Sequence, residues 1–154
     1  MSQSLSLNWR LADQAQTTHL GAVLGPKLQA GDRILLRGDL GAGKTALAAA
    51  ILAGRGYAGA VKSPTYTLVE EYALEDLRIV HADLYRLRDC AELDAIGWRD
   101  YDDGHTAFLI EWPERGGVLG GDIDVSLSVT DDGRQARLRS LSPRGEEILR
   151  SLDR

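Results

Sequence analysis

Apolar and polar residues follow two different periods along the chain, and each period predicts one kind of element. Segments in which apolar residues alternate with polar ones, or follow one another without a break, predict strands. They are Ser6–Leu11, Arg33–Arg37, Thr67–Ala73, Leu77–Ala82, Thr106–Ile110, Ile123–Thr130 and Gln135–Leu141. Segments with one apolar stripe, or rich in Ala and Leu, predict helices. They are a helix capped by Asp13 that ends near Gln29, then Thr45–Ala53, which Gly54 would stop, Ala91–Ile96 and Pro143–Leu152.

The order of these elements predicts the fold class. Strands and helices alternate early in the chain, as they do in parallel sheets, while strands dominate later. Two pairs of strands are interpreted as hairpins, one around the turn Leu74–Leu77 and one across Asp131-Asp132-Gly133, a favoured turn sequence. The 154 residues contain no repeat and no low-complexity linker. We therefore expect one α/β domain over residues 1–154, with three layers, a mostly parallel core and added antiparallel strands.

The charge balance argues against a protein that holds nucleic acid alone. The chain has 18 basic and 23 acidic residues, a net charge of −5, whereas such proteins usually carry a basic face. The only basic cluster, Arg134 to Arg139, lies in a predicted strand and is interpreted as a solvated face. We find no signal peptide and no transmembrane segment, and the single cysteine, Cys90, excludes an internal disulfide. We expect a cytoplasmic protein that meets nucleic acid only through a partner, with Cys90 buried.

A glycine-rich segment joins the second predicted strand to the next helix. Gly38-Asp39-Leu40-Gly41-Ala42-Gly43-Lys44-Thr45 fits the pattern G-x-x-x-x-G-K-[ST] of a phosphate-binding loop, the P-loop. Between a strand and a helix, such glycines let successive backbone N–H groups turn toward a phosphate, and the helix dipole adds positive potential. Lys44 would reach the β- and γ-phosphates, and the Thr45 hydroxyl would ligate Mg²⁺. With the element order, this motif predicts a P-loop NTPase-type sheet.

The nucleotide expected in this loop is ATP. The N-K-x-D motif with which GTPases read guanine needs an asparagine downstream of the P-loop. The only asparagine of this chain is Asn8, which lies upstream. A guanine site of that type is therefore excluded.

Two acidic residues at strand ends are candidates for the chemistry around the phosphates. Asp83 follows the apolar run in LRIVHAD, and Glu111 follows the one in TAFLIE. The carboxyl ends of parallel strands form the edge where ligands bind in open α/β sheets. One acid would hold Mg²⁺ and the other would orient water, and the sequence leaves open which does which. A single acid at a strand end is often only a loop residue or a helix cap. The functional interpretation therefore depends on the occurrence of both acids beside the P-loop. His81 shares a strand face with Asp83 and is interpreted as a packing or hydrogen-bonding residue.

A loop suited to sensing the γ-phosphate lies between the P-loop helix and Asp83. In Lys62-Ser63-Pro64-Thr65-Tyr66-Thr67, the hydroxyls of Thr65 and Thr67 are candidates for that contact, because nucleotide switches have such a loop at this place. The alternative is a plain Ser-Pro turn that leads into a strand. The residues alone favour neither interpretation.

Five segments together resemble the TsaE family, also called YjeE. They are GDLGAGKT, VKSPTYTLVEEY, HADLYRL, ELDAIGWRDY and LIEWPE, in this order and at compatible spacing between about Asp13 and Arg139. The resemblance implies a P-loop sheet with extra antiparallel strands and a small ATPase needed to make threonylcarbamoyladenosine (t6A) in bacterial tRNAs that read ANN codons. It also implies ATP or ADP with Mg²⁺ as ligands and slow hydrolysis. The implied partners are TsaB and TsaD, on whose heterodimer the protein would dock, with TsaC supplying the carbamoyl-adenylate.

The resemblance further implies contacts with the nucleotide and the metal. The phosphate-binding residues would be Asp39, Leu40, Gly41, Ala42, Gly43, Lys44, Thr45 and Ala46. Asp13 and Thr17 would lie on the base side, and Arg134 would contact the nucleotide from the late turn. Thr45, Asp83 and Glu111 would surround the metal and the water, with Thr65 as a further catalytic residue.

The same resemblance implies a switch and a partner surface. Ser63, Thr65, Tyr66 and Thr67 would form the switch, and Trp112 of the EW pair would belong to the partner surface. The alternative for Trp112 is a ring packed under the sheet edge. Two positions depart from the family pattern, because Gln14 stands where Glu is common and Ala82 where Phe is frequent.

Three classes of protein would use such a P-loop. They are the ATPase component of t6A synthesis, a small-molecule kinase and a nucleotide-gated interaction module. A kinase usually needs an acceptor pocket and an arginine-bearing lid, for which Arg115 before Gly116-Gly117 is the only hint. The KSPTYT loop suits the interaction module. We predict the ATPase component and keep the other two classes as alternatives.

Overall fold

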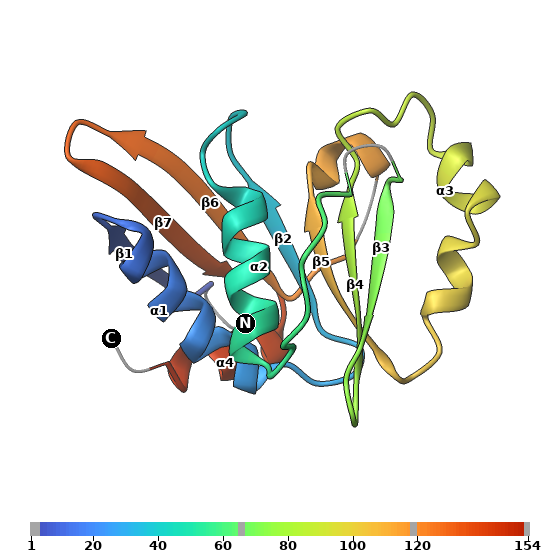
Figure 1. Cartoon of the computed structure of the whole chain (residues 1–154), viewed down its shortest axis with the longest axis horizontal. Helices are drawn as coiled ribbons and strands as arrows, with labels where there is room; N and C mark the ends of the chain where they lie inside the picture. Colours follow the sequence, from blue (N-terminus) through green and yellow to red (C-terminus); the bar gives the residue numbers. More distant parts are fainter. Residues whose placement is uncertain (1–3, 65–66, 118–119, 153–154) are drawn as a thin grey trace.

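The alternation of strands and helices in the sequence produces one sheet with helices packed on it (Figure 1). The computed structural model describes residues 4–64, 67–117 and 120–152. The strands are β1 (Ser6–Leu11), β2 (Arg33–Arg37), β3 (Val69–Ala73), β4 (Arg78–Asp83), β5 (Thr106–Glu111), β6 (Ile123–Thr130) and β7 (Gly133–Ser140). The α-helices are α1 (Gln14–Leu24), α2 (Lys44–Gly54), α3 (Ala91–Ala95) and α4 (Pro143–Arg150), and the 3₁₀ turns are η1 (Gly25–Lys27), η2 (Trp98–Tyr101) and η3 (Pro113–Gly116).

The sheet has a parallel centre and antiparallel edges. Its strand order is β1-β7-β6-β2-β5-β4-β3. The four strands β6, β2, β5 and β4 run parallel to one another, whereas β3, β7 and β1 pair antiparallel with their neighbours. Every residue of β5 is buried, as its unbroken apolar run requires. The predicted fold class, a three-layer α/β sheet of P-loop NTPase type with added antiparallel strands, is confirmed.

Two apolar clusters make the layers, one on each face of the sheet. On one face, α1 and α2 lie side by side over the sheet (Figure 1), and Leu24, Ile51 and Leu36 belong to the same buried cluster. On the other face, the segment with α3 and η2 covers the sheet, and the ring of Trp98 packs 5.4 Å from that of Phe108. No helix in the described part of the chain is both long enough and apolar enough to cross a membrane.

Helices α1 and α2 touch through their backbones. A Cβ atom on Gly21 would lie 2.3 Å from the carbonyl carbon of Ala50, and one on Gly54 would lie 2.3 Å from the carbonyl oxygen of Gly21. Real Cβ contacts are never so short, so only glycine fits at both positions. Helix α2 ends at Gly54, within one residue of the prediction, and Gly54 also allows the close approach of α1.

This contact predicts a strong effect on stability. Gly21→Val should lower the free energy of unfolding by about 3 kcal/mol, because the new side chain forces the two helices apart. Gly120→Val is the matched control, since nothing lies within 4 Å of a Cβ atom there, and its effect should stay within about 0.5 kcal/mol. Urea unfolding measures the free energy of unfolding of both variants. Equal midpoints for the two variants would contradict the close approach.

Two local expectations are wrong. Helix α1 ends at Leu24 and not near Gln29, because Pro26 lacks an N–H and clashes with the preceding turn, so the chain continues as η1. Strand β3 begins at Val69, two residues later than predicted, because Leu68 has a φ of 67°, which no strand residue adopts. Cys90 is exposed and not buried. The other boundaries agree with the prediction within two residues, the usual uncertainty of element ends.

Candidate nucleotide site

Strand β2 and helix α2 hold the P-loop between them, as the motif predicts. Gly43, the residue before α2, has a φ of 107°, and Gly41 has a φ of 81°. Residues with a Cβ atom rarely adopt these angles, so the glycines allow the loop to turn sharply at the start of the helix. No side chain caps α2 at this end. Its first N–H groups can therefore serve a phosphate.

The side chain of Lys44 lies across this loop and is nearly buried. Its Nζ donates to the carbonyl oxygens of Gly38 at 2.5 Å and Asp39 at 3.0 Å. The same atom lies 4.4 Å from the centre of the Trp112 ring, a cation–π distance. With 5% of its surface exposed, Lys44 brings a poorly hydrated positive charge to the loop, which is what a phosphate would meet.

Glu111 and Asp83 lie side by side at the carboxyl edge of the sheet. The parallel register of β4 and β5 places the two residues directly opposite each other. The Thr45 hydroxyl contacts both carboxylate oxygens of Glu111, at 3.1 and 3.0 Å. The Asp83 carboxylate instead accepts the backbone N–H of Tyr85 at 3.1 Å. Of the two acids, Glu111 is the one in contact with the P-loop.

The electrostatics of this pair favour a cation. Both acids are largely stripped of water, with 8% of Asp83 and 2% of Glu111 exposed. Burial raises the pKa of the Asp83 carboxyl above its ordinary value, against the hydrogen bond from Tyr85, and the charge of Glu111 adds to the rise. Among the described residues, no three His, Cys, Asp or Glu side chains gather as a metal site. The donors present, two carboxylates and a hydroxyl beside a phosphate loop, fit Mg²⁺, which takes one or two carboxylates and completes its shell with phosphate oxygens and water.

His81 lies behind Glu111 and is completely buried. Its Nε2 is 2.6 Å from Oε2 of Glu111, while its Nδ1 has no hydrogen-bond partner within the described ranges. The sequence places His81 on the strand face of Asp83, but the contact with Glu111 was missed. The missing information is the register between β4 and β5, which no local pattern contains.

Trp112 covers Lys44 from the end of β5. The residue is half-buried and packs against the smaller core cluster. Its ring lies 5.0 Å from that of Tyr85, and the Arg115 guanidinium lies 5.4 Å from the Tyr85 ring. Together these contacts make a stack of Lys44, Trp112, Tyr85 and Arg115. Apart from the EW pair, the sequence contained no signal that these side chains would meet.

Backbone strain gathers beside the two acids. The non-glycine residues with positive φ in the described chain are Leu68, at 67°, and Trp112, at 55°. Trp112 follows Glu111, and the carbonyl of Leu68 accepts the N–H of Asp83 at 2.9 Å. Such left-handed residues cost free energy and cluster at functional sites. Their positions support a functional site at this edge.

A cavity of about 260 Å³ lies over these groups. It is lined by Leu40, Gly41, Gly43, Lys44, Thr45, Ala46, Asp83, Glu111 and Trp112. Most of the predicted phosphate, metal and catalytic residues thus meet in one place. Asp39 and Ala42 belong to the same loop without lining the cavity.

Neither of the predicted base-side residues, Asp13 and Thr17, lines the cavity. Asp13 caps α1 by accepting the N–H of Gln16 at 3.0 Å, and Thr17 is buried on the same helix. Arg134 reaches from β7 to the P-loop, where it donates to the carbonyl of Gly41 at 3.2 Å. Arg134, Arg137 and Arg139 are all exposed, as a solvated face requires, and Arg134 in addition contacts the P-loop.

The predicted switch is only partly described. Thr65 and Tyr66 lie outside the described residues. Ser63 and Thr67 are exposed, neither lines the cavity, and the Thr67 hydroxyl donates to Glu70 at 3.1 Å. The segment returns to the sheet at Leu68, beside Asp83.

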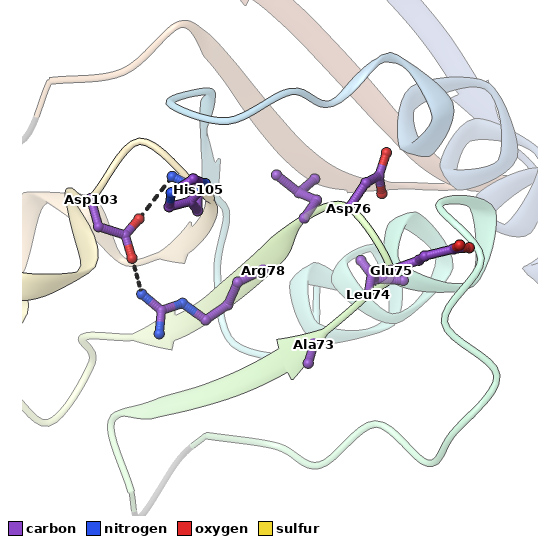
Figure 2. Close-up of a pocket in the computed structure, with 8 residues that line it drawn as sticks. Ala73, Leu74, Glu75, Asp76, Arg78, Asp103 and His105 are labelled. Carbon is purple, nitrogen blue, oxygen red and sulfur yellow. Dashed lines mark hydrogen bonds and ion pairs between the residues drawn. The ribbon is translucent and has the colours of Figure 1, made fainter.

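A second hollow lies at the opposite edge of the sheet (Figure 2). Arg78 begins β4, whereas Asp83 ends it, so this hollow is about 17 Å from the acids. Asp103 accepts from the Arg78 guanidinium, the His105 backbone N–H and the Thr106 hydroxyl. The bond from the His105 N–H lowers the pKa of Asp103 below its ordinary value. These bonds join the starts of β4 and β5, and we interpret the hollow as structural.

Comparison with known proteins agrees with the motifs. The family model described as "Threonylcarbamoyl adenosine biosynthesis protein TsaE" matches residues 11–139. The tRNA threonylcarbamoyladenosine biosynthesis protein TsaE of Haemophilus influenzae is 48% identical over 118 residues, 75% of each chain. Its counterpart in Nostoc sp. is 40% identical over 133 residues, 83% of this chain and 82% of the relative. The crystal structure of Bacillus subtilis YdiB has the same fold, with a TM-score of 0.75 over 97% of this chain and 95% of that one at 22% identity. The chain therefore belongs to the TsaE family of threonylcarbamoyl adenosine biosynthesis proteins.

Proposed function

We propose that this protein binds ATP with Mg²⁺, hydrolyses ATP slowly, and thereby supports threonylcarbamoylation of tRNA by a TsaB–TsaD complex. The observation that carries the proposal is the meeting of Lys44, Thr45, Asp83 and Glu111 at one cavity over a P-loop. Membership of the TsaE family supplies the pathway.

Each of these side chains has a part that its contacts suit. Lys44 would exchange the carbonyls of Gly38 and Asp39 for phosphate oxygens. The Thr45 hydroxyl and the Glu111 carboxylate, already in contact, would hold Mg²⁺, with Asp83 orienting the attacking water. The ion would supply neutralisation of the charge on the phosphates. Trp112, above Lys44, would keep bulk water from this side of the cavity.

Slow hydrolysis is expected from the residues that line the cavity. Those that the structure describes include no arginine, whereas fast P-loop NTPases place one against the transferred phosphate. Arg134 is bonded to Gly41, and Arg115 lies on the ring of Tyr85. The hint of a kinase lid at Arg115 thus gains no support from its position.

A partner that reads the nucleotide state would find a suitable surface at the rim of the cavity. Leu40, at the tip of the P-loop, is a large apolar side chain with 68% of its surface exposed. Leu68, which follows the predicted switch, bonds to Asp83 at the same edge. We therefore assign the rim to TsaB and TsaD, and tRNA would be met only through them.

The test is a reconstituted reaction. Purified TsaB, TsaC and TsaD are held constant with tRNA, threonine, bicarbonate and ATP, and modified tRNA is counted over many turnovers. We expect several-fold more product when this protein is present, and no gain from its Lys44→Ala variant. Equal yields with and without the protein would contradict the proposed function and leave only the nucleotide site. Labelled phosphate that moves from ATP to an added small-molecule acceptor would favour the kinase alternative.

A further inference from the structure

We infer that His81 is a positioning residue for Glu111: one hydrogen bond from its Nε2–H holds the carboxylate that faces Thr45 in the orientation that a bound Mg²⁺ needs. The inference rests on the proposed function, because it adds a residue to the metal side of the same site. His81 itself is not among the residues that line the cavity.

The first argument is the burial of His81. The residue is 0% exposed, and its Nδ1 is the buried side-chain atom without a hydrogen-bond partner among the described residues. A buried polar atom without a partner costs free energy, and such atoms in native proteins need an explanation. An apolar side chain of similar size would fill the same space between strands without this cost. We explain this cost by the contact that the other ring nitrogen, Nε2, makes with Glu111.

The second argument is the direction of that contact. An ionised carboxylate can only accept, so a proton must lie on Nε2 for the 2.6 Å contact to be a hydrogen bond. The bond from this N–H to a charged acceptor belongs to the stronger class of hydrogen bonds.

The third argument is the position of Glu111 between two partners. Its carboxylate receives the Thr45 hydroxyl from α2 and the His81 ring from β4. The last torsion of a glutamate side chain has no sharp preference, so the plane of the carboxylate depends on such contacts. Mg²⁺ demands near-ideal octahedral geometry. Loss of the hydrogen bond that orients a ligating group commonly lowers metal affinity by about tenfold to 100-fold.

The test uses two variants of the full-length protein and a readout that needs no turnover. His81→Leu removes the donor and keeps the bulk, while His81→Gln retains an N–H donor at similar reach. Calorimetry measures ADP affinity with and without Mg²⁺ for each. We expect unchanged affinity for ADP alone, an enhancement by Mg²⁺ that is about tenfold smaller in His81→Leu, and partial recovery in His81→Gln. Equal Mg²⁺ enhancement in all three proteins, or none in the parent, would overturn the inference.

A second pair of measurements separates positioning from packing. In the Glu111→Ala background, His81→Leu should cause no further loss of Mg²⁺ enhancement, because Glu111→Ala removes the group through which His81 acts. Additive losses would overturn the inference. In the ligand-free parent, ¹⁵N NMR of the imidazole should show the Nε2–H tautomer, and its chemical shift should change in Glu111→Gln. The opposite tautomer would overturn the inference, and this measurement remains possible even if His81→Leu fails to fold. None of these readouts involves TsaB, TsaD or tRNA, so failure of the reconstituted reaction would leave them standing.

Discussion

Lys44→Ala should lower the affinity for ATP by about 100-fold, which corresponds to about 2.8 kcal/mol. Lys44 is 5% exposed, so the charge that it offers to a phosphate is weakly screened by water. Alanine leaves the polyphosphate with the loop amides and the helix dipole alone. Calorimetry with ATP and Mg²⁺ measures the loss.

Lys27→Ala is the matched control for this prediction. Lys27 lies in η1, at the far end of α1 from the P-loop, and its backbone carbonyl accepts a hydrogen bond from Arg144. This variant should bind ATP like the parent. Lys44→Ala also removes two bonds to loop carbonyls and the contact with Trp112, so both variants are compared below their melting temperatures. An unchanged ATP affinity in folded Lys44→Ala protein would remove the assignment of the nucleotide site.

The parts of the site that lie within one short segment could be predicted from the sequence. The P-loop is contiguous, and its glycines, Lys44 and Thr45 follow from the motif and the flanking strand and helix. Asp83 and Glu111 are far apart in the chain, but each ends an apolar strand. Because parallel strands end at the same edge, the class of sheet was enough to bring the two acids together.

The contacts between distant segments could not be predicted. The bond between His81 and Glu111 spans 30 residues and depends on strand register, and the bond from Arg134 to Gly41 spans 93 residues and depends on the length of a hairpin. Gly54 was interpreted only as a helix stop, because glycine usually interrupts helices, whereas its close approach to Gly21 in another helix was missed. Such positions are decided by tertiary packing, which local patterns do not contain.

One error had a local signal that was overlooked. Pro26 stands two residues after the last residue of α1, at Leu24, and a proline commonly interrupts a helix in this way. The apolar stripe continues to Leu28, which is fully buried although it lies beyond the helix. The hydrophobic periodicity therefore predicted correctly that Leu28 is buried, but it overestimated the length of the helix.

The two acids should differ in their effect on hydrolysis. Glu111→Ala should lower Mg²⁺-dependent ATP hydrolysis by about 100-fold, because its carboxylate contacts Thr45 and both groups would meet the metal. Asp83→Ala should lower it by about tenfold, since the Asp83 carboxylate accepts the backbone N–H of Tyr85 and has no hydrogen bond to the P-loop among the described residues. Affinity for ATP should fall much less in both variants, because metal and water placement matter most in the transition state.

Single-turnover release of phosphate at saturating ATP gives these rates without interference from product release. Glu114→Ala is the matched control: Glu114 lies on η3, three residues after Glu111, and pairs at the surface with Arg37 at 3.2 Å. Glu111→Gln belongs in the series because the amide can still accept from His81, so a loss seen in both Glu111 variants cannot come from leaving that buried donor without a partner. If Glu111→Ala and Asp83→Ala release phosphate as fast as Glu114→Ala, neither carboxylate takes part in the chemistry. A larger loss for Asp83→Ala than for Glu111→Ala would exchange their roles, and the contact of Glu111 with Thr45 would then serve only to hold α2 against the end of β5.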